Sequence, residues 1–428
     1  MILLSNYFNA RLLGVCLFLM CIIKDGFSQD GLSPIYMDNT NLEGVPGQRF
    51  IHMHNQAGIR IEYNLNRQKL VLWTSPLADK SRKASDRNFS NRDDRTSIFD
   101  FIGFPSFDVA NFINCDYDPF YSRLNFKNNT IHILSIIDKP IVVVWFDHDD
   151  LIDVKTDKQD TVTKRDEKVL ESYHFDRGKT FRFWAGIGAS GSKAWHQPVH
   201  ESGRSHYSRF HLSGQDALYI YGDQYHENDM DSLLVIARQT PASLIKRNEH
   251  LIAMALSTGK ISVRNNPELQ RIIDLNRRVL LAMQDRSGSL RAALRHIYYL
   301  IWHRDGGMVS SLNAYCGWTE PLQKWNQFIL ENPTVNDKGE RFFGQLVSPI
   351  TKLEEDGPFY GIWSFFTYYT QTGDRSLITS ENLKVLEDNI SWLENNYYDT
   401  GRGLFFRYHY GEAPYYTSPG DGYDAAVG

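Results

Sequence analysis

Three segments in the second half of the chain each place charged or amide side chains beside aromatic residues. Their candidate residues are Trp302, Arg304 and Asp305 in the first segment, Gln345, Glu354, Glu355 and Asp356 in the second, and Arg407, His409, Glu412, Asp421 and Asp424 in the third. Carboxylates, amides and arginine exchange paired hydrogen bonds with vicinal hydroxyl groups, while aromatic rings cover apolar C–H surfaces. Together these side chains have the composition of a sugar-binding pocket.

The first segment, "YYLIWHRDGGMVSSL", interrupts an apolar stretch with Arg304 and Asp305. Two interpretations are open. The pair can form a surface turn in which Asp305 caps a helix that begins at Gly306 or Gly307. It can also line a pocket, which the neighbouring Trp302 and the second segment favour. The acidic residues of the second segment can likewise form a solvated helix start, and those of the third can be exposed loop residues.

The elements that must position these segments differ between the two halves of the chain. From about residue 48 to 238, apolar and polar residues alternate with period two. Short runs such as "PIVVVWFDHDD" and "ALYIYGD" are rich in β-branched and aromatic residues and stand between turn signals. This pattern predicts an N-terminal, mostly antiparallel β-sandwich.

Helical spacing replaces the alternation from about residue 242. Pro241 and Pro267 stand at plausible first positions of two helices, and further aromatic-rich helical segments follow. Long polar connections separate these segments, notably 332–356 and 399–423. Because sites are often built on loops held by rigid elements, the sequence predicts helices that carry the three segments at their ends.

Several other patterns in the first half carry little chemistry. Gly186, Gly188 and Gly191 match a dinucleotide-binding spacing, but the strand-like surroundings favour a glycine-rich hairpin or bulge. The acidic run 147–150 lacks the ligand spacing of a known Ca²⁺ loop, which favours a solvated strand end. His206 and His211 would need further ligands to hold a metal. We expect no metal and no cofactor.

Composition narrows the class of partner. The formal net charge is −5, and no basic tract suggests nucleic acid as a partner. Aromatic residues make up 13% of the chain, which suits both carbohydrate stacking and a well-packed core.

The N-terminus has the pattern of a secretory signal peptide. Arg11 precedes the apolar run 12–23, and Gly26 and Ser28 are the small residues of a cleavage site, which predicts a mature start at Gln29. The run is short for a span of about 20 residues, so we expect no membrane anchor after cleavage. The protein is therefore predicted to be exported, to the periplasm or the medium. Cys115 and Cys316 remain in the mature chain and give no disulfide framework.

Two of the segments carry a family resemblance. "YLIWHRDGGMV" resembles the W-x-R-D segment of glucoamylase-type glycoside hydrolases, whose catalytic domain is an (α/α)6 barrel. "LEEDGPFYGIWSFFTYYTQTGD" resembles the next inner helix of that barrel. Bacterial members also carry an N-terminal β-sandwich and a helical linker. After the signal peptide at 1–28, the resemblance implies a sandwich at 29–240, a linker at 241–284, and the first part of an (α/α)6 toroid at 285–428.

The resemblance also implies roles for individual residues. Arg304 and Asp305, with Trp302 nearby, would hold the hydroxyls of the terminal sugar. The family's acid commonly stands in a W-E-E stretch, which this sequence lacks; the nearest equivalent is Glu412, with Asp421 or Asp424 as alternatives. We expect the general base beyond Gly428, so that these 428 residues alone would be inactive.

The activity implied is cleavage of α-linked glucosides or oligosaccharides with inversion. That reaction needs a protonated carboxyl and a carboxylate roughly 6.5–9.5 Å apart. The missing W-E-E leaves a second hypothesis open, namely a carbohydrate-binding or structural protein that keeps the fold without the acid and base.

Overall fold

The computed structural model describes most of the chain between residues 50 and 405. The described residues are 50–74, 96–97, 101–155, 161–166, 169–176, 179–188, 196–201, 205–214, 216–223, 235–236, 239–259, 261–291, 301, 303–335, 339, 341–343, 357–401 and 403–405. The predicted signal peptide lies outside them, and the domain boundaries inferred from the sequence remain predictions. Within these ranges the order is strands first and helices second, as predicted.

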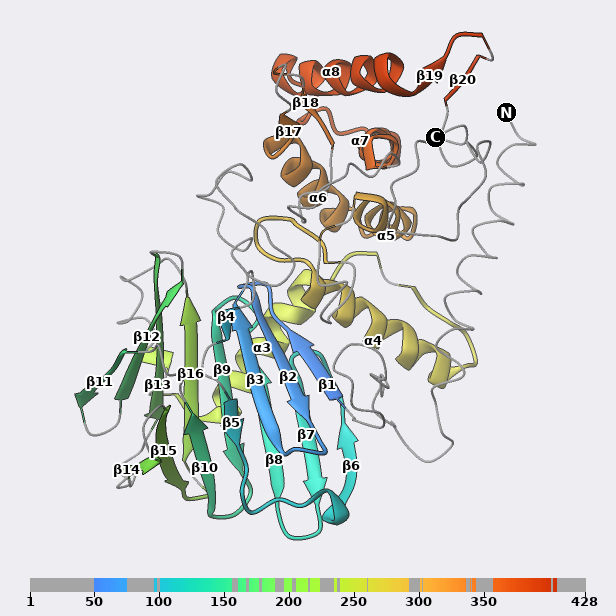
Figure 1. The fold of residues 1–428 in the computed structure, drawn as a ribbon. Coiled ribbons are helices and arrows are strands. Elements are labelled where there is room, and N and C mark those ends of the chain that lie inside the picture. Colours follow the sequence, from blue (N-terminus) through green and yellow to red (C-terminus); the bar gives the residue numbers. More distant parts are fainter. Residues whose placement is uncertain are drawn as a thin grey trace.

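Two antiparallel sheets form the N-terminal part (Figure 1). The first, sheet A, has the order β1-β2-β3-β5-β10-β15-β14, with β4 pairing β3. Its strands are β1 (Phe50–His54), β2 (Ile59–Asn64), β3 (Lys69–Thr74), β4 (Thr96–Ser97), β5 (Phe101–Gly103), β10 (Asp150–Lys155), β14 (His196–Glu201) and β15 (Ser205–Leu212).

The second, sheet B, has the order β11-β12-β13-β16-β9-β8-β7-β6. Its strands are β6 (Phe112–Asp116), β7 (Tyr121–Phe126), β8 (Thr130–Ser135), β9 (Ile141–Phe146), β11 (Thr161–Asp166), β12 (Val169–Asp176), β13 (Lys179–Gly188) and β16 (Ala217–Asp223), and a 3-10 turn, η3 (Val109–Asn111), leads into β6. Gly186 pairs with Val169 on one side and Tyr219 on the other, so the predicted hairpin or bulge is wrong at this residue. Gly188 is the last residue of β13 and pairs with Ala217, and Gly191 lies outside the described residues.

The two sheets share one apolar core. Ile59 and Ile61 of β2 in sheet A lie in the same buried cluster as Val142 and Val144 of β9 in sheet B. Successive side chains of a strand point to opposite faces, so the alternation read from the sequence places every second residue in this core. The odd-numbered residues of β9 face outward, and Val143 there packs in a second cluster with Leu244 of the first helix.

Two helices follow the sheets, α3 (Pro241–Ala255) and α4 (Pro267–Met283). Each begins at the proline predicted from the sequence. The Thr240 side chain accepts a hydrogen bond from the Ser243 N–H before α3, and Asn266 accepts one from the Leu269 N–H before α4. These caps satisfy backbone donors that a helix start leaves open.

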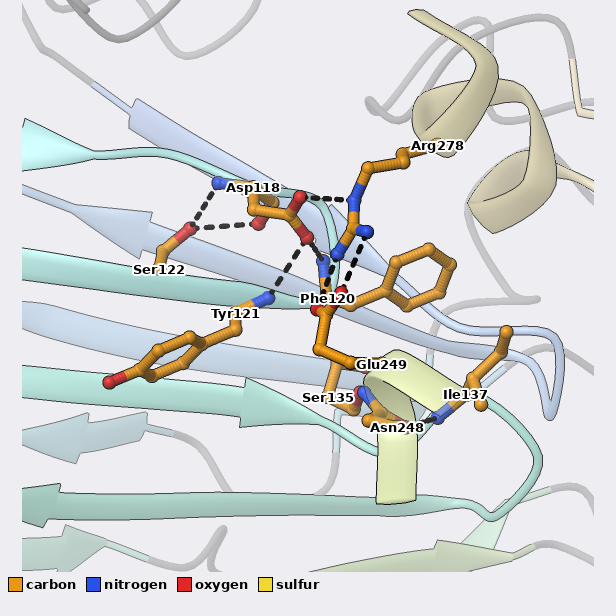
Figure 2. Close-up of polar contacts among 9 residues, drawn as sticks. All are labelled: Asp118, Phe120, Tyr121, Ser122, Ser135, Ile137, Asn248, Glu249 and Arg278. Carbon is orange, nitrogen blue, oxygen red and sulfur yellow. Dashed lines mark hydrogen bonds and ion pairs between the residues drawn. The ribbon is translucent and has the colours of Figure 1, made fainter. Parts of the chain in front are cut away.

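Polar contacts, buried for Asn248 and partly buried for Arg278, fix α3 and α4 to sheet B (Figure 2). Asn248 of α3 donates to the Ser135 carbonyl at 2.8 Å and accepts from the Ile137 N–H at 2.9 Å. Arg278 of α4 bonds the Asp118 carboxylate and reaches Glu249 of α3 at 2.7 Å. Burial alone would lower the pKa of Arg278, but the two carboxylates raise it overall, so the cation is retained.

Four further helices form two hairpins, seen above the sheets in Figure 1. They are α5 (His303–Tyr315) with α6 (Glu320–Glu331), and α7 (Gly357–Thr372) with α8 (Ser380–Tyr397). Two short ribbons accompany them, β17 (Thr334–Val335) with β18 (Arg341–Phe342), and β19 (Tyr398–Asp399) with β20 (Leu404–Phe405). A closed toroid remains a prediction. None of the helices described is long and apolar enough to cross a membrane.

Candidate functional site

The N-terminal ends of α5 and α7 lie against each other. A Cβ placed on Gly357, the first residue of α7, would be 3.5 Å from both Cβ and Nδ1 of His303, the first residue of α5. A Cβ on Gly307 would be 3.0 Å from the Tyr360 carbonyl oxygen. The residue numbers of both partners increase together, from His303 with Gly357 to Gly307 with Tyr360. The two helices are therefore parallel, and their starts are neighbours in space although more than fifty residues of sequence separate them.

Glycines allow this close approach. A Cβ on Gly306 would lie 2.6 Å from Cζ2 and Cζ3 of Trp325 in α6, and one on Gly361 would lie 2.8 Å from Cγ of Phe343. Ordinary contacts begin near 3.4 Å, so a larger residue at either position would displace an aromatic ring. The "DGG" of the first segment is thus a packing requirement of the frame that carries the polar pair.

Arg304 and Asp305 stand in the first turn of α5. Their side chains are 39% and 42% exposed, and Arg304 Nε lies 4.0 Å from Asp305 Oδ2. The helix begins at His303, so the interpretation of Asp305 as the cap of a helix starting at Gly306 or Gly307 is wrong. An acid in the first turn still interacts favourably with the helix dipole. Both groups are accessible to a ligand at the shared end of α5 and α7.

A buried histidine packs beneath the start of α5, against aromatic rings of neighbouring segments. His303 is 1% exposed and meets the rings of Trp325 and Phe343 edge-on, at centroid distances of 5.7 and 6.2 Å. Burial lowers the pKa of His303 to about 4, so its ring is neutral near pH 7. From the sequence, His303 has no assigned role. The apolar residues on both sides of the motif were the feature of the sequence that could have indicated its burial.

The remaining candidates lie outside the described residues. They are Trp302, Gln345, Glu354, Glu355, Asp356, Arg407, His409, Glu412, Asp421 and Asp424. Trp302 directly precedes α5 in the sequence, and Asp356 directly precedes α7. Among the described residues of the two helix starts, 303–307 and 357–361, Asp305 is the one carboxylate. This part of the site can therefore bind hydroxyl groups, whereas a catalytic general acid and general base would have to come from residues outside these two helix starts.

The acidic run 147–150 serves a turn. Asp150 accepts from Asn129 at 3.0 Å, and Asp149 accepts from the Gly214 N–H at 2.9 Å. These hydrogen bonds engage the carboxylates of Asp149 and Asp150 at the connection between β9 and β10, which agrees with the predicted strand end. In the part of the chain that the structure describes, no three His, Cys, Asp or Glu side chains converge on a possible metal site.

A cavity of about 460 Å³ opens between α3 and α4. Its lining includes Gln270, Asp274 and Arg277. Arg277 bonds the carbonyl oxygens of Leu256 and Thr258 and lies over the Trp318 ring, and Gln270 bonds the Ile261 carbonyl. These groups hold the loop between the helices, and none of the sequence candidates lines the cavity.

Comparison with known proteins gives a fold likeness. No family model and no curated protein matches the chain. Among solved structures, a protein assigned as a kojibiose phosphorylase from the human microbiome has a TM-score of 0.50 and 10% identity, covering 84% of this chain and 63% of its own. A GH92-family glycosyl hydrolase has a TM-score of 0.36 and 10% identity, covering 69% of this chain and 54% of its own.

The chain spans less than two thirds of the length of either protein. At this identity the likeness to the first of these structures concerns the fold alone. The narrower glucoamylase-type relationship remains a prediction.

Proposed function

We propose that this protein is an exported carbohydrate-active enzyme that cleaves α-linked glucosides, with the terminal sugar bound where the starts of α5 and α7 meet. The observation that carries the proposal is the contact between His303 and Gly357, because it brings together the starts of the two helices that adjoin the first two polar segments in the sequence. An arginine and a carboxylate, each about 40% exposed there, offer a donor and an acceptor to vicinal hydroxyls.

The division of labour follows from the residue types. Arg304 donates to the sugar hydroxyls, Asp305 accepts from them, and Trp302 covers an apolar sugar face. Glu412 is the proposed general acid, with Asp421 and Asp424 as alternatives. Its carboxyl must be protonated when the substrate binds, so its pKa has to be raised by burial or by a neighbouring carboxylate. The general base is proposed to lie beyond Gly428.

Hydrolysis with inversion is the first candidate reaction. Water, deprotonated by the base, attacks the anomeric carbon while the acid protonates the departing glycosidic oxygen. Phosphorolysis is the second candidate, and the fold likeness to a kojibiose phosphorylase favours it. In that reaction inorganic phosphate forms the new bond to the anomeric carbon, and the acid has the same task. The products distinguish the two, because hydrolysis releases a free sugar and phosphorolysis a sugar 1-phosphate.

The test uses the full-length protein with maltooligosaccharides, trehalose, kojibiose and aryl α-glucosides, each with and without inorganic phosphate. Free glucose and glucose 1-phosphate are measured separately. We expect one of the two products, and we expect Arg304→Met to abolish most of the turnover. Arg375→Met, which removes an exposed arginine after α7, is the matched control and should keep full turnover.

Binding without turnover would support the non-catalytic alternative instead. In that case calorimetry would give a heat of binding with the same sugars, which Arg304→Met weakens, while neither product forms. Turnover that is insensitive to both Arg304→Met and Asp305→Asn would contradict the proposed site.

A further inference from the structure

Three rings lie together on the outer face of sheet B, away from the helix starts. They belong to Tyr121 of β7, His132 of β8 and Trp145 of β9. Their planes are within 13° of parallel, and the centroids of His132 and Trp145 are 4.8 Å apart. Ile131 and Val144, their neighbours in sequence, point into the sandwich core, which places the rings on the opposite face.

A chain of hydrogen bonds orders these rings. The Tyr121 hydroxyl lies 2.8 Å from His132 Nδ1, and His132 Nε2 lies 2.9 Å from Asp147 Oδ1. Burial lowers the pKa of His132, which keeps the ring neutral near pH 7. Because the Asp147 carboxylate can only accept, Nε2 carries the proton and donates, and Tyr121 donates to Nδ1. The lone pairs of the Tyr121 oxygen then remain available to accept a bond from a ligand.

Polar side chains surround the rings. Arg123 pairs with Asp116 at 2.5 Å, and Asn125 bonds Asn114. Arg123, Asp116 and Asp147 are each close to half exposed, at 48%, 45% and 53% of the side chain. Arg123 and Asp116 compensate each other, whereas Asp147 bonds a neutral ring and keeps its negative charge. The face therefore offers donors and acceptors together with one uncompensated negative charge.

The rings are partly covered, since His132 is 7% exposed and Tyr121 and Trp145 are partly buried. The apolar cluster beneath α3 includes Val143, and Tyr121 and Trp145 pack at its edge with Ile245 of α3. Figure 2 shows the Tyr121 ring pointing away from the junction with Arg278, whereas the Tyr121 backbone N–H bonds Asp118. The rings are thus held from one side by the helix junction, and their positions are fixed before any ligand binds.

We propose that this outer face, formed by Tyr121, His132 and Trp145 with Arg123 and Asp147, binds a neutral oligosaccharide. Ordered rings cover apolar sugar surface, and carboxylate, phenol and guanidinium groups bond hydroxyls. The uncompensated Asp147 carboxylate disfavours an anionic ligand, and the half-exposed ionic groups around the rings do not suit the apolar centre of a protein interface. The class of ligand rests on the proposed function. The face lies on sheet B, so it is a second glycan-binding site, distinct from the one at the starts of α5 and α7.

The test measures the affinity of the full-length protein for maltoheptaose by calorimetry and for soluble α-glucan by affinity electrophoresis. Trp145→Ala should weaken binding by about tenfold or more, and Tyr121→Phe, which keeps the ring and removes the hydroxyl, by a smaller factor. Asp147→Asn changes an exposed group and tests the same face should Trp145→Ala misfold. Phe366→Ala, which removes an exposed aromatic ring from α7, is the control and should bind as the parent does.

The outcomes separate this inference from the proposed function. Weakened glycan binding in Trp145→Ala with unchanged cleavage of an aryl α-glucoside supports both. Weakened binding in a protein that cleaves nothing supports the outer-face site and refutes the enzymatic proposal. Cleavage with parental glycan affinity in both Trp145→Ala and Asp147→Asn refutes the outer-face site, as does a parent that binds neither glycan. A variant whose glycan affinity is unchanged but whose self-association is lost would make the face an interface between copies, which also refutes it.

Discussion

Replacing Gly306 by alanine tests the frame that carries the polar pair. The added methyl would stand 2.6 Å from two atoms of Trp325, where ordinary contacts begin near 3.4 Å, so the ring must move by about 1 Å. Trp325 is 0% exposed and packs against Phe328 and His303, which leaves little room to move. Overpacking of this kind costs up to about 3 kcal/mol, and alanine returns about 1 kcal/mol of helix propensity. The expected net loss is about 2 kcal/mol.

Equilibrium unfolding in urea, followed by tryptophan fluorescence, measures this loss. Ser310→Ala is the control on the same helix; its hydroxyl is buried with no partner in the described part of the chain, so removing it should be neutral or stabilising. In a Trp325→Leu background the cost of Gly306→Ala should shrink, because the smaller side chain yields space. A Gly306→Ala protein as stable as the parent would refute the close packing of α5 on α6.

Three other perturbations have defined outcomes. The pKa of His303 is depressed to about 4 in the folded state, so the unfolded state binds one more proton between pH 6.5 and 4; stability is lost as pH falls through that window, by at most about 3 kcal/mol, and His303→Leu should flatten this part of the pH profile. Arg278→Met leaves two carboxylates without their cation and should cost about 2 to 3 kcal/mol in thermal unfolding, against less than about 1 kcal/mol for Arg247→Met at the more exposed ion pair of α3. Asn248→Leu leaves two buried backbone groups unbonded, so hydrogen exchange at the α3 junction should accelerate as about 1 to 3 kcal/mol is lost; parental values in these measurements would contradict the contacts described.

Local sequence patterns predicted the secondary structure well. The run of β-branched and aromatic residues in "PIVVVWF" predicts a strand, and β9 buries one face in the sandwich and the other near α3. Pro241 and Pro267 mark their helices because proline lacks the N–H that a first helical residue does not use. These features depend on residues a few positions apart, and so they can be read without a structure.

The candidate site depends on distant residues. No spacing within the first segment shows that Gly306 faces Trp325 or that His303 meets Gly357, because the first contact arises when α5 packs on α6 and the second when the two hairpins pack together. The interpretation that starts this helix at Gly306 or Gly307 is three or four residues too late, since Trp302, which precedes His303 in the sequence, is not a residue type that usually caps a helix and His303 is held in place by tertiary burial. The ring stack of sheet B likewise needs the pairing of His132 with Trp145, which no single strand reveals.

The central claim is that the starts of α5 and α7 form one sugar site, and a double-mutant cycle tests it most directly. Asp305→Asn and Asp356→Asn are combined, and kcat/KM for an aryl α-glucoside is measured in the full-length protein, with Asp305→Asn and Asp374→Asn as the control pair. Asp374 lies beyond the opposite end of α7. We predict a coupling of about 1 kcal/mol between Asp305 and Asp356, and additive effects for the control pair. Additivity within about 0.3 kcal/mol for both pairs would contradict it.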